Sequence, residues 1–209
     1  MLGSDEIVNG SEISQIRLER RDAAENRQRI LYAALKLFEQ YGVEQVSMNQ
    51  IANEALVGPG TLYRRYRSKG ELCMDLIKDN IVQLFDDIET YLRDNCSFTP
   101  SQRLKGILNL FIRFRERKAQ LITGVEESSS TNSLKSRMRS PLYDELHQLL
   151  VELFDEMNAT ERTNFNSVFR ADILLTALRS DSYLFQKDVR NYSPEMILEQ
   201  LCALFILHK

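Results

Sequence analysis

The chain has 209 residues, of which 43% are hydrophobic and 27% are charged, and its formal net charge at pH 7 is −3. This length is enough to bury a sizeable core, and it favours two domains over one. An acidic chain of this kind does not bind nucleic acid by bulk attraction, so such a function requires positive charge concentrated on one face.

Cysteine and histidine content argues against disulfides and metal sites. Cys73, Cys96 and Cys202 are odd in number and far apart, which favours a reducing compartment, and the chain has only two histidines. We expect neither a metal site nor a cofactor. No apolar run reaches the ~20 residues that span a bilayer, and no signal-peptide pattern opens the chain. The sequence therefore predicts a cytoplasmic protein without membrane association.

The first 41 residues predict an extension followed by a helix. Residues 1–22 show little apolar periodicity and begin with an acidic tip, which predicts partial disorder with a helical extension near residue 17. From residue 23 to residue 41, apolar side chains recur every three or four positions, and Gly42 stops the pattern. We expect this amphipathic helix to support the segment that follows.

That segment predicts two short helices joined by a tight turn. Ser47 and Gln50 have the capping-box spacing, which starts the first helix at Met48. Gly58 and Pro59 then fit the N-cap and the first position of a second helix. This arrangement is typical of a helix-turn-helix motif.

The second of these helices carries the positive charge. Leu62 and Tyr66 are spaced to face the core, which leaves the polar and basic side chains on the other face. The residues on that face are Thr61, Tyr63, Arg64 and Arg65. A solvated basic loop would explain a charge run alone, but the caps and the turn favour an element that reads DNA.

The run GPGTLYRRYRSKGEL resembles the signature of the tetracycline-repressor (TetR) family. The matching residues are Gly60, Thr61, Leu62, Tyr63, Tyr66, Ser68, Lys69 and Leu72. With the upstream helices included, the resemblance covers about residues 24–77. The chain departs from the family pattern at Leu56, where a turn glycine is usual, and at Gly58 and Pro59, which replace the commoner Ser-Lys opening of the reading helix.

The resemblance implies a homodimeric transcriptional regulator that binds a palindromic operator in double-stranded DNA. It implies a repressor that a small-molecule effector of unknown identity releases from that operator. The residues that it places at DNA are Ser47, Met48, Asn49, Pro59, Gly60, Thr61, Tyr63, Arg64, Arg65 and Lys69. Of these, Ser47, Tyr63 and Lys69 are expected to hold phosphates.

The apolar period continues as helices to the end of the chain, and no strand pattern appears, so the predicted fold is all-α. We expect a DNA-binding domain over residues 23–70 and a helical ligand-binding and dimerisation domain over residues 71–209. One long helix over residues 69–95 is expected to connect them. A serine-rich stretch at residues 126–133 predicts a loop, and helices are expected on either side of it.

The last two helices, predicted over residues 165–185 and 193–207, are apolar on more than one side. Deep burial within one chain would explain this pattern, but the terminal position and the resemblance favour an interface between two copies. The residues expected in that interface are Leu174, Leu178, Leu201 and Phe205.

Polar residues on these apolar helices are candidates for a ligand pocket. We expect Arg115, His147 and Arg170 at the surface or in an interface, with a role in lining a pocket beside Phe111 as the alternative. The adjacent carboxylates of Glu126 and Glu127 would diverge on a helix, so we expect them in solvent.

The sequence favours a regulator over an enzyme. It contains no Gly-rich phosphate loop, no Gly-x-Ser-x-Gly elbow and no HExxH motif. Two further interpretations remain at this point. Control by a protein partner that docks on residues 126–139 would keep the DNA-binding role, whereas a helical enzyme or scaffold would make the basic turn accidental.

Overall fold

The computed structural model describes residues 10–128 and 141–206, and every regular element within these two ranges is a helix. This confirms the all-α class. The chain divides into two compact units between Leu72 and Cys73, and each unit has its own buried residues. Within the described ranges, none of the helices is long and apolar enough to cross a membrane.

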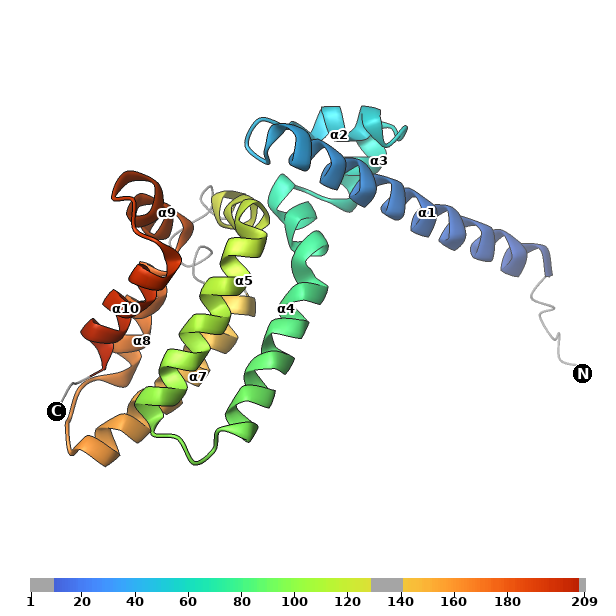
Figure 1. Ribbon diagram of the computed structural model, residues 1–209. Coiled ribbons are helices and arrows are strands. Elements are labelled where there is room, and N and C mark those ends of the chain that lie inside the picture. Colours follow the sequence, from blue (N-terminus) through green and yellow to red (C-terminus); the bar gives the residue numbers. More distant parts are fainter. Residues whose placement is uncertain (1–9, 129–140, 207–209) are drawn as a thin grey trace, which may run out of the picture. The chain divides into compact units, whose positions relative to one another are not determined.

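The first unit consists of α1 (Gly10–Tyr41), α2 (Met48–Glu54), α3 (Pro59–Arg65) and the start of α4 (Lys69–Asp94). Helix α2 packs against both α1 and α3 (Figure 1). Ile30, Ile51 and Leu62, one from each helix, are fully buried. These three residues lie at positions that the apolar periodicity assigns to the core.

The predicted caps of the two short helices are confirmed. The backbone N–H of Gln50 donates to Ser47 Oγ at 3.3 Å, and the backbone N–H of Ser47 donates to Gln50 Oε1 at 2.8 Å. Gly58 is the N-cap of α3 and Pro59 is its first residue. Leu56, between the two helices, has a φ of 54°, a left-handed conformation that favours glycine.

Helix α1 begins well before the predicted start. It runs from Gly10, so the predicted boundary between residues 22 and 23 falls inside one continuous helix. The side chains of residues 21–25 are exposed, and Ile30 is buried. The helical extension predicted near residue 17 lies within this helix. The predicted disordered tip lies outside the described residues.

The second unit is built around α5. Its helices are α4 from Cys73 onwards, α5 (Pro100–Ser128), α7 (Pro141–Glu161), α8 (Ser167–Ala177), α9 (Ser180–Leu184), the π-helix η2 (Phe185–Val189) and α10 (Pro194–Phe205). Helix α5 contacts α7, α9 and α10, and α8 contacts α7 and α10 (Figure 1). Ser193 caps α10, with its Oγ accepting from the backbone N–H of Met196 at 3.2 Å, as its Ser-Pro-Glu start predicts.

Two predictions about this unit are wrong. Helix α5 continues to Ser128, so residues 126–128 of the predicted loop are helical, and its residues from 129 onwards lie outside the described ranges. The single helix predicted over residues 165–185 is interrupted at Arg179, whose extended backbone (φ −65°, ψ 156°) separates α8 from α9. The N-cap of α10 involves adjacent residues, so the sequence predicts it. The break between α8 and α9 instead depends on a contact with a residue of α5.

Candidate nucleic-acid interface and effector cavity

Helix α3 divides into a buried face and a basic face. Leu62 is fully buried and Tyr66, its C-cap, is 5% exposed. The side chains of Tyr63, Arg64 and Arg65 are exposed, as the spacing predicts. The guanidinium of Arg65 lies over the Tyr66 ring, 5.8 Å from its centroid. The surface of α3 therefore offers two arginines and a tyrosine hydroxyl, the groups that contact phosphates and guanine edges in DNA.

A concavity of about 610 Å³ runs along the basic face of α3, between this helix and α1. It is lined by Asp22, Ala23, Asn26, Ile30, Thr61, Arg64 and Arg65. Thr61 is half-buried there, while Pro59 and Gly60 are exposed at the start of α3. Thr61, Arg64 and Arg65 of α3 thus share one surface with residues 22–30 of α1.

Lys69 has a structural role that the sequence did not indicate. Its ammonium donates to three backbone carbonyls in the turn after α1, with Nζ 2.5 Å from the oxygen of Val43, 3.3 Å from that of Glu44 and 3.0 Å from that of Val46. An ammonium has three N–H donors, and all three are used here. Lys69 thus anchors the α1–α2 turn, and its phosphate contact stays a prediction.

The start of α2 presents fewer groups than predicted. Ser47 and Asn49 are exposed, but Met48 is 8% exposed and belongs to the core. The side chain of Met48 is therefore largely unavailable to DNA. Ser47 Oγ is engaged in the capping box. The N–H groups at the start of α2 remain suited to a phosphate oxygen.

In the second unit, the four predicted ligand residues do not converge on one pocket. Phe111 is 1% exposed and lies in the core, with its ring centroid 6.5 Å from that of Phe114. The guanidinium of Arg170 lies 4.1 Å from the Phe154 ring centroid and donates to the carbonyl of Phe205 at 2.6 Å, near the end of α10. Phe111 is therefore a core residue and Arg170 joins α8 to α10, roles that periodicity cannot distinguish from lining a pocket.

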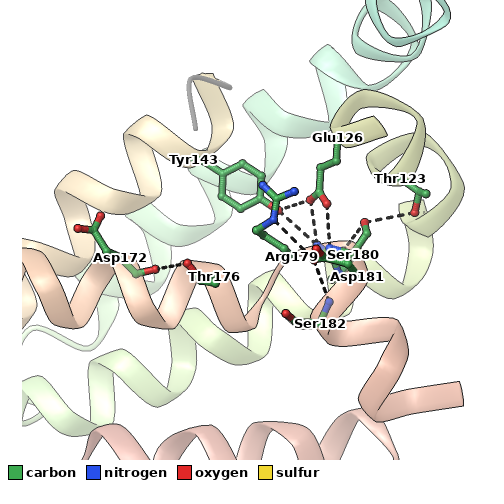
Figure 2. A network of polar contacts seen from close by, with 10 residues as sticks. Thr123, Glu126, Tyr143, Asp172, Thr176, Arg179, Ser180, Asp181 and Ser182 are labelled. Carbon is green, nitrogen blue, oxygen red and sulfur yellow. Dashed lines mark hydrogen bonds and ion pairs between the residues drawn. The ribbon is translucent and has the colours of Figure 1, made fainter. Parts of the chain in front are cut away.

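Arg115 belongs to a buried polar network. Arg115 is 2% exposed and Glu126 is 9% exposed, and Arg115 Nη1 lies 3.6 Å from Glu126 Oε1. Arg115 also donates to Ser180 Oγ at 2.5 Å, and the Tyr143 hydroxyl donates to Glu126 Oε1. The backbone N–H of Ser180 donates to Glu126 Oε2 at 2.8 Å, and Figure 2 shows these two residues facing each other.

The network explains why α8 and α9 are separate helices. Glu126 was expected in solvent, but its carboxylate accepts the first N–H group of α9. Helix α5 is kinked at Lys118 (φ −124°, ψ 19°), between Arg115 and Glu126, and this brings the two charges together on one helix. In a straight helix, side chains interact when they are three or four residues apart, so sequence spacing does not predict the pairing of Arg115 with Glu126. Burial, reinforced by Glu126, raises the pKa of Tyr143 far above its ordinary value, so its hydroxyl stays protonated.

Described residues of the second unit line concavities at two places. One, of about 220 Å³, lies between α7, α8 and the turn that follows α8, and includes His147. The other, of about 630 Å³, is lined by residues of α4, α5 and α10, among them Leu84, Arg113, Arg117 and Leu198. Neither Phe111, beside which a pocket was predicted, nor Arg115 lines this second groove.

Three of the four residues predicted for a dimer interface are buried within the single chain. Leu174, Leu178 and Leu201 are 0%, 1% and 6% exposed within a single chain. Phe205 is half-buried, with its ring centroid 6.1 Å from that of Phe154. Helices α8 and α10 are apolar on two faces, and the periodicity does not show which face the chain itself covers. The exposed apolar residues on these helices are Val168, Phe169, Ile173, Met196 and Leu204.

Comparison with known proteins identifies the family of this chain. Residues 30–74, which contain most of the three-helix motif, match the family of bacterial regulatory proteins named tetR. An HTH-type transcriptional regulator of Staphylococcus aureus strain USA300 is 32% identical over 190 residues, which cover 90% of this chain and 96% of the relative. The chain belongs to the tetR family. A second such regulator, from S. aureus strain MRSA252, is 29% identical over 191 residues, or 91% of this chain and 97% of the relative.

The tetR fold extends beyond the DNA-binding motif. The TetR-family repressor FadR of Thermus thermophilus, solved with lauroyl-CoA, has a TM-score of 0.65 at 19% identity, over 88% of this chain and 96% of FadR. FadR of Bacillus subtilis, solved with stearoyl-CoA, has a TM-score of 0.62 at 14% identity, over 87% and 99%. This tetR-family chain is a DNA-binding transcriptional regulator with an N-terminal helix-turn-helix and a C-terminal helical domain. Among its described side chains, no three His, Cys, Asp or Glu residues are grouped to hold a metal ion.

Proposed function

We propose that this tetR-family regulator is a repressor that binds a palindromic operator as a homodimer and is released by a small-molecule effector. The observation that carries the DNA-binding part is the division of α3, where Leu62 is fully buried while Tyr63, Arg64 and Arg65 are exposed. A helix anchored in this way can enter the major groove without distorting its own core.

Two copies related by a two-fold axis would present two α3 helices to one face of DNA. Each helix reads one half-site, so the operator should be palindromic, with half-site centres ~34 Å or a multiple apart. The exposed apolar residues of α8 and α10 support a dimer through these helices, because Phe169 and Leu204 are 63% and 79% exposed in the single chain. These two residues replace the buried leucines as our proposed interface.

A small-molecule effector is supported by the two concavities of the second unit. The two FadR repressors of the same fold were solved with acyl-CoA ligands, which favours effector control without fixing the effector chemistry of this chain. An effector can change operator affinity only if it binds the DNA-incompetent conformation more tightly. A coupling free energy of ~1 to 3 kcal/mol would weaken operator binding about 5- to 150-fold.

The proposal is tested with labelled duplex from the region upstream of the protein's own gene. We expect tight binding by fluorescence anisotropy, and a loss of ~1 to 3 kcal/mol of operator affinity for Arg65→Ala with little change on an unrelated duplex. Arg93→Ala is the matched control, because Arg93 is exposed on α4, outside the motif. Equal operator affinity of Arg65→Ala and wild type would overturn the assignment of α3.

Cell extract filtered to remove macromolecules tests the effector. Release of the duplex by the filtered extract supports a small molecule. Release only by the unfiltered extract would replace it with a protein partner, whose proposed docking segment, residues 126–139, lies largely outside the described ranges.

A further inference from the structure

The cavity between α7 and α8 has walls that DNA binding leaves unexplained. It measures about 220 Å³ and is lined by Tyr143, Asp144, His147, Asp172, Leu175, Thr176 and Arg179. Helix α7 supplies the first three of these, α8 the next three, and Arg179 lies in the turn before α9. Figure 2 shows Tyr143, Asp172, Thr176 and Arg179 gathered in this region.

The charges of this cavity do not cancel. Arg179 is already paired, because its Nε lies 3.6 Å from Oδ1 of Asp181, an exposed residue that does not line the cavity. Asp144 forms no hydrogen bond or ion pair with any residue that the structure describes. Asp172 lies beside His147, so Asp144 is the described carboxylate of the cavity lining that has no counter-charge. The cavity attracts positive charge.

His147 adds an unfilled hydrogen-bonding position. Its Nε2 lies 3.1 Å from Asp172 Oδ1, close enough for an ion pair. The two groups are not aligned for a hydrogen bond, so this buried nitrogen has no hydrogen-bond partner in the described chain. Buried polar atoms of this kind are ordinarily satisfied by protein, water or ligand.

Two of the other lining residues, Tyr143 and Leu175, give the cavity an apolar part. Tyr143 is 8% exposed and Leu175 is 7% exposed, so each contributes a fixed apolar surface. A planar ligand can lie against the tyrosine ring, and a cation placed there is attracted to the face of that ring. The volume admits a ligand of about one ring, smaller than the usual drug-sized pocket.

We propose that this cavity binds a small aromatic cation, with Asp144 and Asp172 as its counter-ions and Tyr143 as its stacking surface. Binding stands on the cavity alone, whereas the assignment of this cation as the effector rests on the proposed function. The link to regulation is Tyr143, which lines the cavity and whose hydroxyl donates to Glu126. Glu126 lies beyond the kink of α5, so a ligand that shifts Tyr143 acts on both α5 and the start of α9.

The test uses two probes of the same shape and opposite charge, benzamidinium and benzoate, titrated into the full chain by isothermal calorimetry without DNA. We expect benzamidinium to bind one site per chain and benzoate to bind at least about tenfold more weakly. Binding of both probes with equal affinity, or of neither at about 10 mM, would overturn the proposal.

Variants locate the binding. Asp172→Asn and Asp144→Asn should each weaken benzamidinium about tenfold or more, since each removes a charge-assisted contact. Asp181→Asn is the matched control, as it removes an exposed carboxylate next to Arg179 but outside the cavity. Thr176→Phe, at the edge of the cavity, should block binding without changing any charge. Binding that survives all three cavity variants in folded protein would show that the site lies elsewhere.

A parallel titration of the operator complex separates this proposal from the proposed function. Benzamidinium that binds through Asp172 but leaves operator affinity unchanged would keep the site and remove its role as the effector site. If the ligand-free chain does not bind the operator, that result would count against the proposed function and not against the cavity.

Discussion

The carboxylate of Glu126 accepts a hydrogen bond from the backbone N–H of Ser180, with Oε2 2.8 Å from the nitrogen. Ser180 is the first residue of α9, and its N-cap, Arg179, makes no side-chain cap hydrogen bond. Glu126 of α5 therefore satisfies a donor that a local cap would ordinarily satisfy. The break between α8 and α9 thus depends on a buried carboxylate whose charge is balanced by Arg115.

The first prediction concerns this buried pair. Arg115→Ala leaves the carboxylate of Glu126 buried without its counter-charge, and we expect the free energy of unfolding to fall by about 3 to 5 kcal/mol. Arg113→Ala, on an exposed position of the same helix, should change it by less than about 0.5 kcal/mol. Urea denaturation followed by circular dichroism measures both. The double variant Arg115→Met/Glu126→Gln removes both charges and should recover part of the loss, and simple additivity would show that the pair is not coupled.

The second prediction is a decline in stability at alkaline pH. Burial, reinforced by Glu126, raises the pKa of Tyr143 above its ordinary value of 10.0. In the unfolded chain this phenol ionises near its ordinary pKa, so the unfolded state loses its proton first, and the stability present below about pH 10 declines as the pH rises further. Tyr143→Phe should show a shallower decline between about pH 9 and pH 11 than the control Tyr63→Phe, whose residue is exposed. Identical slopes would contradict the assignment to Tyr143.

Local signals were predictable from the sequence, and distant contacts were not. The capping box of Ser47 and the Gly58-Pro59 start of α3 involve residues within one turn, so their spacing alone identifies them. The contact of Glu126 with Ser180 joins residues 54 positions apart, and no periodicity encodes it. The burial of Leu174 could not be predicted for the same reason. Helix α8 has two apolar faces, and only its packing against α7 and α10 determines which of them is buried.

The third prediction separates two roles of Lys69. Lys69→Met keeps the apolar stem and removes three hydrogen bonds to backbone carbonyls, so we expect the first unit to lose about 2 to 3 kcal/mol of stability. The dependence of operator binding on salt should keep its slope, because no phosphate contact is lost. Lys78→Met, an exposed position further along α4, is the control. A slope lowered by about one unit with unchanged stability would restore the phosphate contact that the sequence suggested.

The fourth prediction concerns the turn between α2 and α3. Leu56 has a φ of 54° and is 81% exposed, so its side chain contributes strain and little packing. Leu56→Gly should stabilise the chain by about 0.5 to 1 kcal/mol, the relief of left-handed strain less the extra entropy of glycine in the unfolded state. Gly42, with a φ of 82° and no atom within 4 Å of an added Cβ, gives the reverse test. Gly42→Ala should lower the free energy of unfolding by about 1 kcal/mol, and opposite signs for the two variants are required.

The last prediction places the dimer interface on the exposed apolar residues of α8 and α10. Phe169 and Leu204 are 63% and 79% exposed in one chain, so aspartate at either position costs a folded monomer little. In a dimer that covers these residues, each aspartate would be buried without a partner, and the interface would lose several kcal/mol. Light scattering after size exclusion should therefore give a folded monomer for Phe169→Asp and Leu204→Asp, and a dimer for wild type.

Two controls decide whether that loss is specific. Val82→Asp, on an exposed apolar position of α4, should stay dimeric, because Val82 is 61% exposed but belongs to neither α8 nor α10. Leu174→Asp should unfold the second unit instead of separating the subunits, since Leu174 is fully buried within one chain. A folded, dimeric Phe169→Asp/Leu204→Asp protein would mean that these side chains face solvent or another partner, and a dimeric, folded Leu174→Asp protein would contradict the packing of α8 described above.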